Sequence, residues 1–346
     1  MKGRPTDINE AVLAAALGAW GIEPVVLTHA PVGFGDHHWV AADAEGRRTF
    51  VTVADLAHKP HCGRDAAEAW TGLSRAMDTA ATLESASGEA ALVAPLLRTG
   101  RGEALLRLTD RYAVSVFPYV DAPTGHFGQV PAPGARRMLM ERLAQLHTTW
   151  APLATPVHDP ALPARAMIEA GLADPQRFRA DAGPYAQRCQ ALLAANCTAL
   201  HAALGRFDSG TARLTSDAST SPATAAVVTH GEPHPGNVLD PGGRTLLVDW
   251  YTVALAPPER DLWLTPPTPR RTCPVTPNSP ATARTRSCSR TTNSAGPSTT
   301  WPPRSTSSAP GTRHPAPGTR HPDTADTRQA WEGLVDAVTA LADGRR

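Results

Sequence analysis

A chain of 346 residues is long enough for two lobes, each with its own hydrophobic core. Its formal net charge of +1 and isoelectric point near 7.8 give no electrostatic case for nucleic-acid or membrane binding. The five cysteines form no CxxC pair, which argues against a zinc site or a disulfide framework and favours free cytosolic thiols.

The N-terminal part of the chain predicts a helix followed by a small sheet. Residues 8–17 have the apolar spacing of an amphipathic helix that ends near Gly18. This run is too short to span a bilayer, and the acidic residues Asp7 and Glu10 argue against a secretory signal, so we expect a cytoplasmic protein. Short apolar runs then predict strands at 24–29, 38–41 and 49–53.

Two glycines lie between the first two predicted strands. In Gly33-Phe34-Gly35, the missing side chains would let backbone N–H groups approach phosphate oxygens. A plain hairpin turn is the more common explanation of a G-x-G pattern, so the motif alone is weak evidence for a phosphate-binding loop. His37 and His38 follow this motif and would either face such a site or cover it.

The middle of the chain is predicted to be mostly helical. Apolar spacing over 65–83 predicts a helix that packs on the sheet, and strands are expected at 92–94 and 112–120. The segment from Phe117 to Gly125 is interpreted as the linker between two lobes. Further helices are predicted at 135–150, 164–172 and 185–204, and a Ser/Thr/Ala-rich loop at 209–223.

The most informative stretch is 227–262. Apolar runs at 227–228 and 246–248 predict strands that fold back on each other through the turn Asp240-Pro241-Gly242-Gly243. Carboxylate and amide oxygens are the groups that phosphoryl transfer needs, because they can orient a hydroxyl and hold Mg²⁺ against nucleotide phosphates. The stretch supplies them in Glu232, Asn237 and Asp249.

Two histidines flank Glu232 at a spacing that would suit a helical zinc site, namely His230 and His234. The prolines and the glycine at 233, 235 and 236 exclude a regular helix there, so this interpretation is disfavoured. A metallohydrolase built on these histidines would carry stoichiometric zinc. We interpret His230 instead as a structural residue that braces the loop.

The same stretch resembles the catalytic core of the aminoglycoside phosphotransferase family, within the choline-kinase-like and protein-kinase-like superfamily. The family pattern is H-G-D-x-x-x-x-N, a short hairpin, an aspartate on a strand and a D-L-W-like helix start. This chain has, in that order, His230-Gly231-Glu232, Asn237, Val248-Asp249-Trp250 and Glu259-Arg260-Asp261-Leu262-Trp263. The resemblance implies a bilobal α+β fold, with a small N-terminal antiparallel sheet lobe and a mainly helical C-terminal lobe.

The resemblance also implies an activity. The reaction would be ATP-dependent transfer of a γ-phosphoryl group to a hydroxyl of a small molecule, an aminoglycoside or a related metabolite. Glu232 would be the catalytic residue that orients the hydroxyl or accepts its proton, and Asn237 and Asp249 would hold Mg²⁺. Asp261 is interpreted as a cap or brace.

The nucleotide would bind in the N-terminal lobe. Gly33 and Gly35 would cover the phosphates, and the backbone of Phe117, Tyr119 and Val120 would hydrogen-bond adenine. Neither nucleic acid nor membrane is expected as a partner, and nothing indicates the oligomeric state. The expected domains are a nucleotide-binding lobe at 1–120, a helical catalytic lobe at 121–264, a low-complexity segment at 265–322 and a C-terminal helix at 323–346.

Two positions depart from the family pattern. Glu232 replaces the usual catalytic aspartate and is one methylene longer, so the loop must be shaped for it. The superfamily usually has a lysine on the third strand, where this chain has Thr52, and the only nearby lysine is Lys59. Either Lys59 or an arginine replaces it, or the site works with Mg²⁺ alone, or nucleotide binding is weak. Glu68 would then be either the helix acid that braces such a lysine or a surface residue.

The chain changes character after Trp263. From 265 to 322 it contains no Asp, Glu, Leu, Ile, Met or Phe, and PGTRHP occurs twice, which predicts disorder. A genuine insertion and a reading-frame slip are both compatible with this composition. We favour the slip as a hypothesis, because GC-rich DNA read out of frame gives such a Pro/Arg/Ser/Thr bias. Residues 326–341 then predict an amphipathic helix.

A second function follows from the same observations. A nucleotide-binding pseudokinase with little or no turnover would also explain Thr52, Glu232 and the low-complexity segment at 265–322.

Overall fold

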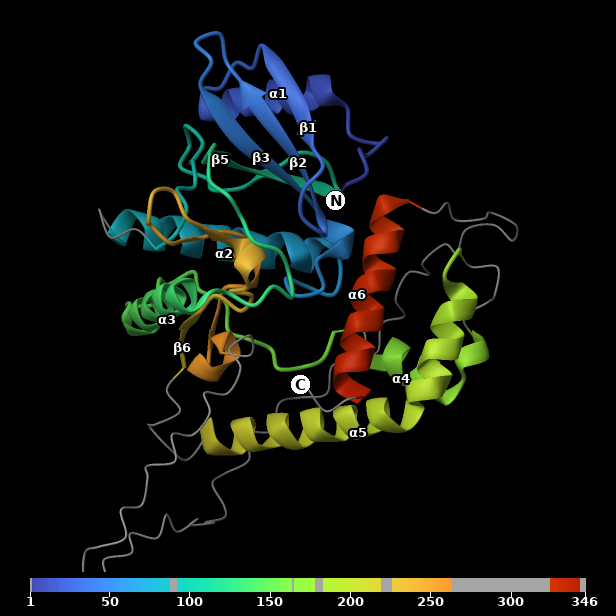
Figure 1. The fold of residues 1–346 in the computed structure, drawn as a ribbon. Coiled ribbons are helices and arrows are strands. Elements are labelled where there is room, and N and C mark those ends of the chain that lie inside the picture. The colour runs from blue at the N-terminus through green and yellow to red at the C-terminus, as the bar shows by residue number, and fades with distance from the viewer. Residues whose placement is uncertain are drawn as a thin grey trace, which may run out of the picture.

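The computed structural model describes residues 2–87, 92–163, 165–177, 183–218, 226–262 and 324–342. Its N-terminal part is an antiparallel five-stranded sheet in the order β1-β2-β3-β5-β4 (Figure 1). The strands are β1 (Val26–Ala30), β2 (Asp36–Ala42), β3 (Arg48–Asp55), β4 (Leu106–Arg107) and β5 (Tyr112–Pro118).

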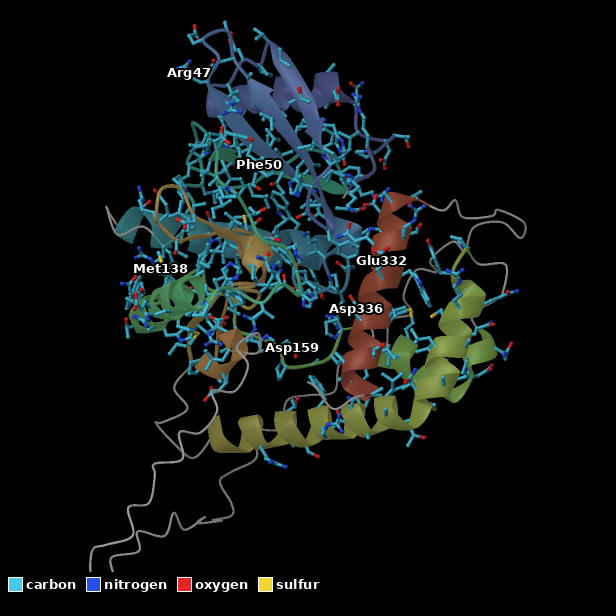
Figure 2. All side chains as sticks on the ribbon, viewed as in Figure 1. Arg47, Phe50, Met138, Asp159, Glu332 and Asp336 are labelled. Atoms are coloured by element: carbon cyan, nitrogen blue, oxygen red, sulfur yellow. The ribbon has the colours of Figure 1, made fainter. Side chains whose placement is uncertain are left out.

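The two faces of this sheet bury different apolar sets because side chains alternate along each strand. One face packs on helix α1 (Glu10–Leu17), and its core includes Trp39 and Val51 of the sheet with Leu13 of the helix. The other face, which carries Ala54 and Ala113, packs on helix α2 (Ala66–Ser87). Figure 2 shows Phe50 nearer to α2 and Arg47 at the outer end of the β2–β3 hairpin.

Helix α2 joins the sheet to the second lobe. The core on its surface continues into helix α3 (Pro133–Thr148), through Leu143 and Leu146, and into the segment that follows residue 226, through Val228 and Leu247. In Figure 1, α2 runs between the sheet and α3. The geometry of the second lobe is therefore fixed to the sheet through one continuous apolar core.

The remaining helices lie in the C-terminal half. They are α4 (Arg165–Ala173), α5 (Ala186–Ala218) and α6 (Ala325–Ala342). Helix α6 lies beside α5, and Tyr185 stacks on Trp331 with ring centroids 5.5 Å apart (Figure 1). None of the helices in the described ranges is long and apolar enough to cross a membrane.

Four short strands frame the stretch at 227–262. β6 (Val227–Thr229) pairs with β9 (Ala254–Ala256), and β7 (Val238–Leu239) pairs with β8 (Leu246–Leu247), both antiparallel. The loop that carries the predicted catalytic residues thus lies between β6 and β7.

The predicted bilobal α+β fold is confirmed, with three local corrections. The runs at 227–228 and 246–248 do not pair with each other, because the turn at 240–243 returns the chain to β7 instead. The predicted loop at 209–223 is helical as far as Ala218, since α5 continues without interruption. The run at 92–94 forms only an isolated parallel bridge between Val93 and Leu247. The predicted disordered segment at 265–322 lies outside the described residues.

The surroundings of two helical glycines, Gly72 in α2 and Gly205 in α5, predict opposite effects of replacing each by alanine. A Cβ at Gly72 would overlap the backbone oxygen of Cys62, whereas a Cβ at Gly205 in α5 would meet nothing within 4 Å. We expect Gly72→Ala to lower the free energy of unfolding by about 1–3 kcal/mol, because the loop before α2 must move. Gly205→Ala should raise it by about 0.5–1 kcal/mol, because alanine is the better helix former. Chemical denaturation measures both changes, and equal effects would contradict the packing described.

Candidate active site

The loop between β6 and β7 is fixed by one buried carboxylate. Asp261, the last residue of the short 3₁₀ helix η8 (Pro258–Asp261), is 1% exposed. Its oxygens accept hydrogen bonds from the backbone N–H groups of His230 at 2.9 Å and Gly231 at 2.6 Å, and lie 2.9 Å from His147 Nε2. Burial alone would raise the pKa of Asp261, but these hydrogen bonds outweigh it and lower that pKa. Asp261 is therefore the predicted brace.

His230 braces the same loop from the inside, as predicted. It is fully buried, its Nε2 lies 2.9 Å from the carbonyl oxygen of Val248, and its Nδ1 accepts the N–H of Glu232 at 3.3 Å. The carbonyl can only accept, so Nε2 carries the proton and the ring is neutral. Burial lowers the pKa of His230 to about 4, which agrees with a neutral structural ring.

Gly231 is required where it stands. Its φ is +94°, and a Cβ would overlap the guanidinium of Arg260. That guanidinium is held under the loop by hydrogen bonds to Thr229 Oγ1 at 2.8 Å and to the carbonyl oxygen of Thr252 at 2.9 Å. The backbone before Glu232 therefore has one conformation, set from both sides.

Glu232 and Asn237 lie at the two ends of this loop and contact each other. Asn237 Nδ2 donates to the carbonyl oxygen of Glu232 at 3.0 Å, and the Asn237 carbonyl accepts the N–H of Val248 at 3.0 Å. The Glu232 carboxylate accepts a hydrogen bond from the hydroxyl of Tyr251 at 2.9 Å. Within the described ranges no hydrogen bond to Asn237 Oδ1 is present, so this amide oxygen is available to a ligand.

Asp249 has an unusual backbone. Its φ of +66° makes it the only residue other than glycine with a positive φ among those that the structure describes. Such strain costs of order 1–3 kcal/mol and is concentrated at functional sites. The residue is exposed to solvent, although protein atoms around it desolvate the carboxylate.

The charged form of the Asp249 carboxylate is also disfavoured by its surroundings. Desolvation raises its pKa to about 7, with Asp36 and Glu232 adding to the rise and Lys59 opposing it. A carboxylate in such a site gains from an added cation.

Lys59 is the cation of this site. It follows β3 and the 3₁₀ helix η2 (Leu56–His58), is 4% exposed, and places Nζ 2.7 Å from Asp36 Oδ2 and 3.8 Å from the centre of the Tyr251 ring. Burial alone would lower the pKa of Lys59, but Asp36 and Asp249 outweigh it and raise that pKa. Lys59 therefore stays charged between the β1–β2 loop and Asp249.

Thr52, at the usual lysine position, and Glu68, the possible brace of such a lysine, both have other partners. Thr52 Oγ1 lies 3.2 Å from His38 Nδ1, and the His38 ring stacks on Phe50. Glu68 forms a surface ion pair with Arg64 through Nε at 2.9 Å. The carboxylate that holds Lys59 comes from Asp36 at the start of β2, and Glu68 is the surface residue that was its alternative interpretation.

The glycine motif forms the β1–β2 loop. Gly33 and Gly35 have φ of +71° and +95°, so both need the conformational freedom of glycine. Asp36 follows Gly35 directly, and its ion pair with Lys59 fixes this end of the loop near Asp249. His38 lies beneath Gly33, where a Cβ would come within 3.0 Å of its Nε2.

The predicted linker begins where β5 ends. The Tyr119 N–H donates to the carbonyl oxygen of Arg48 at 3.1 Å, and Phe117 pairs with Phe50 in the β3–β5 ladder. A hydrogen bond from the Tyr119 N–H to adenine is therefore not expected in this conformation. The chain then reaches the loop between β6 and β7, where the Gly125 N–H donates to the carbonyl oxygen of Pro235 at 3.1 Å.

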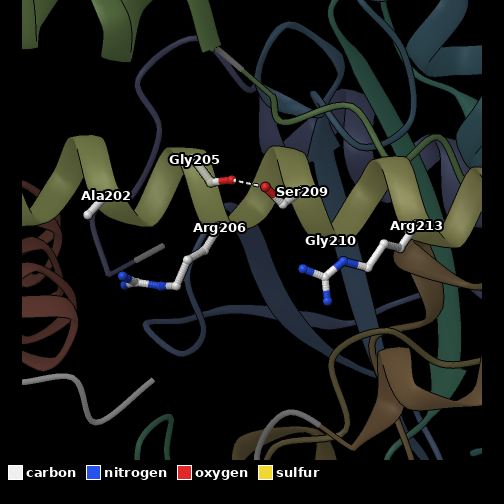
Figure 3. A pocket seen from close by; sticks show the side chains of 6 residues that line it. All are labelled: Ala202, Gly205, Arg206, Ser209, Gly210 and Arg213. Carbon is white, nitrogen blue, oxygen red and sulfur yellow. Dashed lines mark hydrogen bonds between the residues drawn. The ribbon is translucent and has the colours of Figure 1, made fainter. Parts of the chain in front are cut away.

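A separate hollow of about 500 Å³ runs along α5. Its lining residues all come from that helix, and the side chains of Arg206 and Arg213 extend from the same side of it (Figure 3). None of the residues predicted for phosphoryl transfer lines this hollow.

Sequence reasoning missed three contributors to the site. Asp36, Tyr251 and Arg260 act through partners that lie 19 or more residues away in the chain, at Lys59, Glu232 and Thr229. The one available signal was the position of Tyr251, two residues after the predicted metal ligand Asp249.

The described residues hold no group of three or more His, Cys, Asp or Glu side chains placed to bind a metal ion. The region around His230 and His234 contains only the 3₁₀ turn η6 (Pro235–Asn237), in agreement with the prediction that it is no regular helix.

Neither protein-family models nor curated proteins match this chain. Solved structures do. Spectinomycin phosphotransferase APH(9)-Ia, in complex with ADP and spectinomycin, matches with a TM-score of 0.52 at 19% identity, over 74% of this chain and 73% of that one. Amicoumacin kinase matches at 12% identity and a TM-score of 0.46 over 73% of this chain and 67% of that one. An aminoglycoside phosphotransferase from Alicyclobacillus acidocaldarius matches at 17% identity and a TM-score of 0.41, over 75% of this chain and 70% of that one.

The first of these likenesses shows the fold. The chain has the bilobal fold of a small-molecule phosphotransferase, and the resemblance read from residues 230–263 is confirmed at the level of the fold.

The neutral, buried ring of His230 predicts how the stability of the fold depends on pH. Its pKa is lowered on folding, so the unfolded chain binds the proton more tightly, and stability is lost as the pH falls from 6.5 towards about 4. We expect His230→Gln to reduce the loss of unfolding free energy between pH 7.5 and 4.5 by about 2 kcal/mol. His201→Gln, an exposed position on α5, should leave that loss unchanged. Urea denaturation across this pH range tests both, and identical slopes for wild type and His230→Gln would exclude a neutral buried ring.

Proposed function

We propose that the chain is an ATP-dependent phosphotransferase that moves a γ-phosphoryl group to a hydroxyl of a small molecule, an aminoglycoside or a related metabolite. The observation that carries the proposal is the position of Asn237 on the braced loop, where its Nδ2 donates to the Glu232 carbonyl and its carbonyl accepts the N–H of Val248, the residue before Asp249. The buried cation of Lys59 lies beside Tyr251, two residues after Asp249. The fold likeness to a phosphotransferase solved with ADP and spectinomycin supports it.

The residues present fit a divalent cation held against phosphates. Asp249 is a solvent-exposed carboxylate with a raised pKa, and Asn237 has an amide oxygen without a protein partner in the described ranges. Two protein oxygens are few, which suits Mg²⁺, because this ion keeps waters and takes further ligands from nucleotide phosphates. When bound, Mg²⁺ would neutralise charge that develops on the transferring phosphoryl group.

The roles of the protein groups follow from their positions. Glu232 would accept or orient the proton of the acceptor hydroxyl, and Lys59 would supply the positive charge that a strand lysine supplies elsewhere in the superfamily. Gly33 and Gly35 would cover the phosphates through the backbone of the β1–β2 loop. Phe117, Tyr119 and Val120 stay the proposed adenine contacts, with the carbonyl of Tyr119 in place of its occupied N–H.

The proposed domains follow the same division. The nucleotide would bind the lobe at 1–120, and the acceptor would bind against the lobe at 121–264. A cytoplasmic location also stays a prediction.

Turnover tests the function directly. Magnesium- and acceptor-dependent ADP release should appear for at least one member of a panel of aminoglycosides and hydroxylated metabolites. Glu232→Gln should lower kcat at least about a hundredfold, because it removes the proton acceptor and keeps the size of the side chain. Its Kd for Mg–ATP should change less than about twofold. Glu169→Gln, on the surface of α4, is the matched control and should keep full activity.

Two results would contradict this. Stabilisation by Mg–ATP without any acceptor-dependent ADP release would identify a nucleotide-binding pseudokinase. Equal rates for wild type and Glu232→Gln would remove Glu232 from the chemistry.

Lys59 can be tested through nucleotide affinity. The double variant Lys59→Met/Asp36→Asn removes both charges of the buried pair, so neither is left without its partner. We expect its Kd for Mg–ATP to rise at least about tenfold, which corresponds to about 1.4 kcal/mol. Adding Thr52→Lys should recover part of the affinity, because it returns a cation to the third strand. Lys2→Met, at the only other lysine, should have no effect. Isothermal titration calorimetry gives the four constants, and an unchanged Kd in the double variant would exclude Lys59.

A further inference from the structure

Glu232 poses a geometric problem because its side chain has one more rotatable bond than the aspartate usual in this pattern. Its backbone is fixed, since the N–H donates to His230 Nδ1 at 3.3 Å and the carbonyl oxygen accepts Asn237 Nδ2 at 3.0 Å. All remaining freedom therefore lies in the side chain. A carboxylate that must meet a hydroxyl within hydrogen-bond reach loses efficiency when it samples other rotamers.

Tyr251 removes that freedom. Its hydroxyl donates to Glu232 Oε2 at 2.9 Å. Among the described residues, Glu232 Oε1 has no hydrogen-bond partner, so one oxygen is held and the other is left for an acceptor hydroxyl.

Tyr251 is itself held at three points. Tyr251 belongs to the 3₁₀ turn η7 (Trp250–Thr252), which directly follows the strained backbone of Asp249. Cys62 Sγ donates to its carbonyl oxygen at 3.5 Å, and Lys59 Nζ lies 3.8 Å from the centre of its ring. The His61 ring lies beside it at 6.4 Å between centroids. The hydroxyl is thus presented from a rigid position.

We propose that Tyr251 is a positioning residue that holds the Glu232 carboxylate in its working rotamer, and so lets a glutamate act where an aspartate is usual. This inference rests on the proposed phosphotransferase function. Tyr251 itself exchanges no proton and forms no bond with substrate. Its contribution is to the geometry of Glu232 alone.

The test is the loss of one hydroxyl. Tyr251→Phe keeps the ring, and with it the contact with Lys59, and removes only the hydrogen bond to Glu232. We expect kcat to fall about tenfold or more, with KM for ATP and for the acceptor within about twofold. Tyr112→Phe is the matched control, because it removes a hydrogen bond of 2.8 Å to a carboxylate, Asp7, on the α1 face of the sheet. Its kcat should not change.

A second background separates positioning from general damage. In Glu232→Asp the shorter side chain does not reach Tyr251 in the same way, so adding Tyr251→Phe should change kcat less than about twofold. An equal loss in both backgrounds, or no loss in the wild-type background, would overturn the inference.

A crystal structure of Tyr251→Phe gives a readout that needs no activity. The Glu232 carboxylate should leave its place or occupy several rotamers, and an unmoved, fully ordered carboxylate would overturn the positioning role. If wild type transfers no phosphoryl group to any acceptor, the proposed function fails. The same structure then still decides whether Tyr251 holds Glu232.

Discussion

The site depends on a carboxylate that does no chemistry in the proposed reaction. Asp261 is buried and would be costly to ionise alone, but it receives the N–H groups of two successive residues and faces His147. Together with the neutral His230 and the guanidinium beneath Gly231, it leaves the loop one conformation. A loop rich in proline and glycine becomes rigid here because its polar backbone groups are satisfied by fixed partners rather than by water.

A second set of contacts links the two lobes through charge. Asp36 begins β2 in the N-terminal sheet, Lys59 follows β3, and Tyr251 and Asp249 come from the turn after β8. The buried ion pair is no strong evidence for stability, since desolvation opposes the Coulomb attraction. The pair matters through its position, because it keeps a charged lysine against the Tyr251 ring, two residues after Asp249.

The elements that could be predicted are those with local signals. The helix that ends at Gly18 and the three N-terminal strands follow from apolar spacing and turn glycines, and the order of polar residues from His230 to Asp249 indicated the site. The pairing of elements that lie far apart in the chain could not be predicted from the sequence. The partner of β6 is β9 rather than β8, and Asp36 rather than Glu68 holds Lys59, because both depend on contacts that no short window of sequence contains. The extension of α5 past residue 209 shows helix continuity overriding the turn preference of Ser and Thr.

The two departures from the family pattern share one residue. The Glu232 side chain is one methylene longer than that of an aspartate and needs to be held, and Lys59, seven positions after Thr52, needs a surface to lie against. Tyr251 provides both, through its hydroxyl to Glu232 and through its ring to Lys59. Without the Tyr251 hydroxyl the Glu232 carboxylate would be free to change rotamer, and without the Tyr251 ring Lys59 would keep only its ion pair with Asp36. Tyr251 therefore couples the position of the Lys59 cation to that of the Glu232 carboxylate.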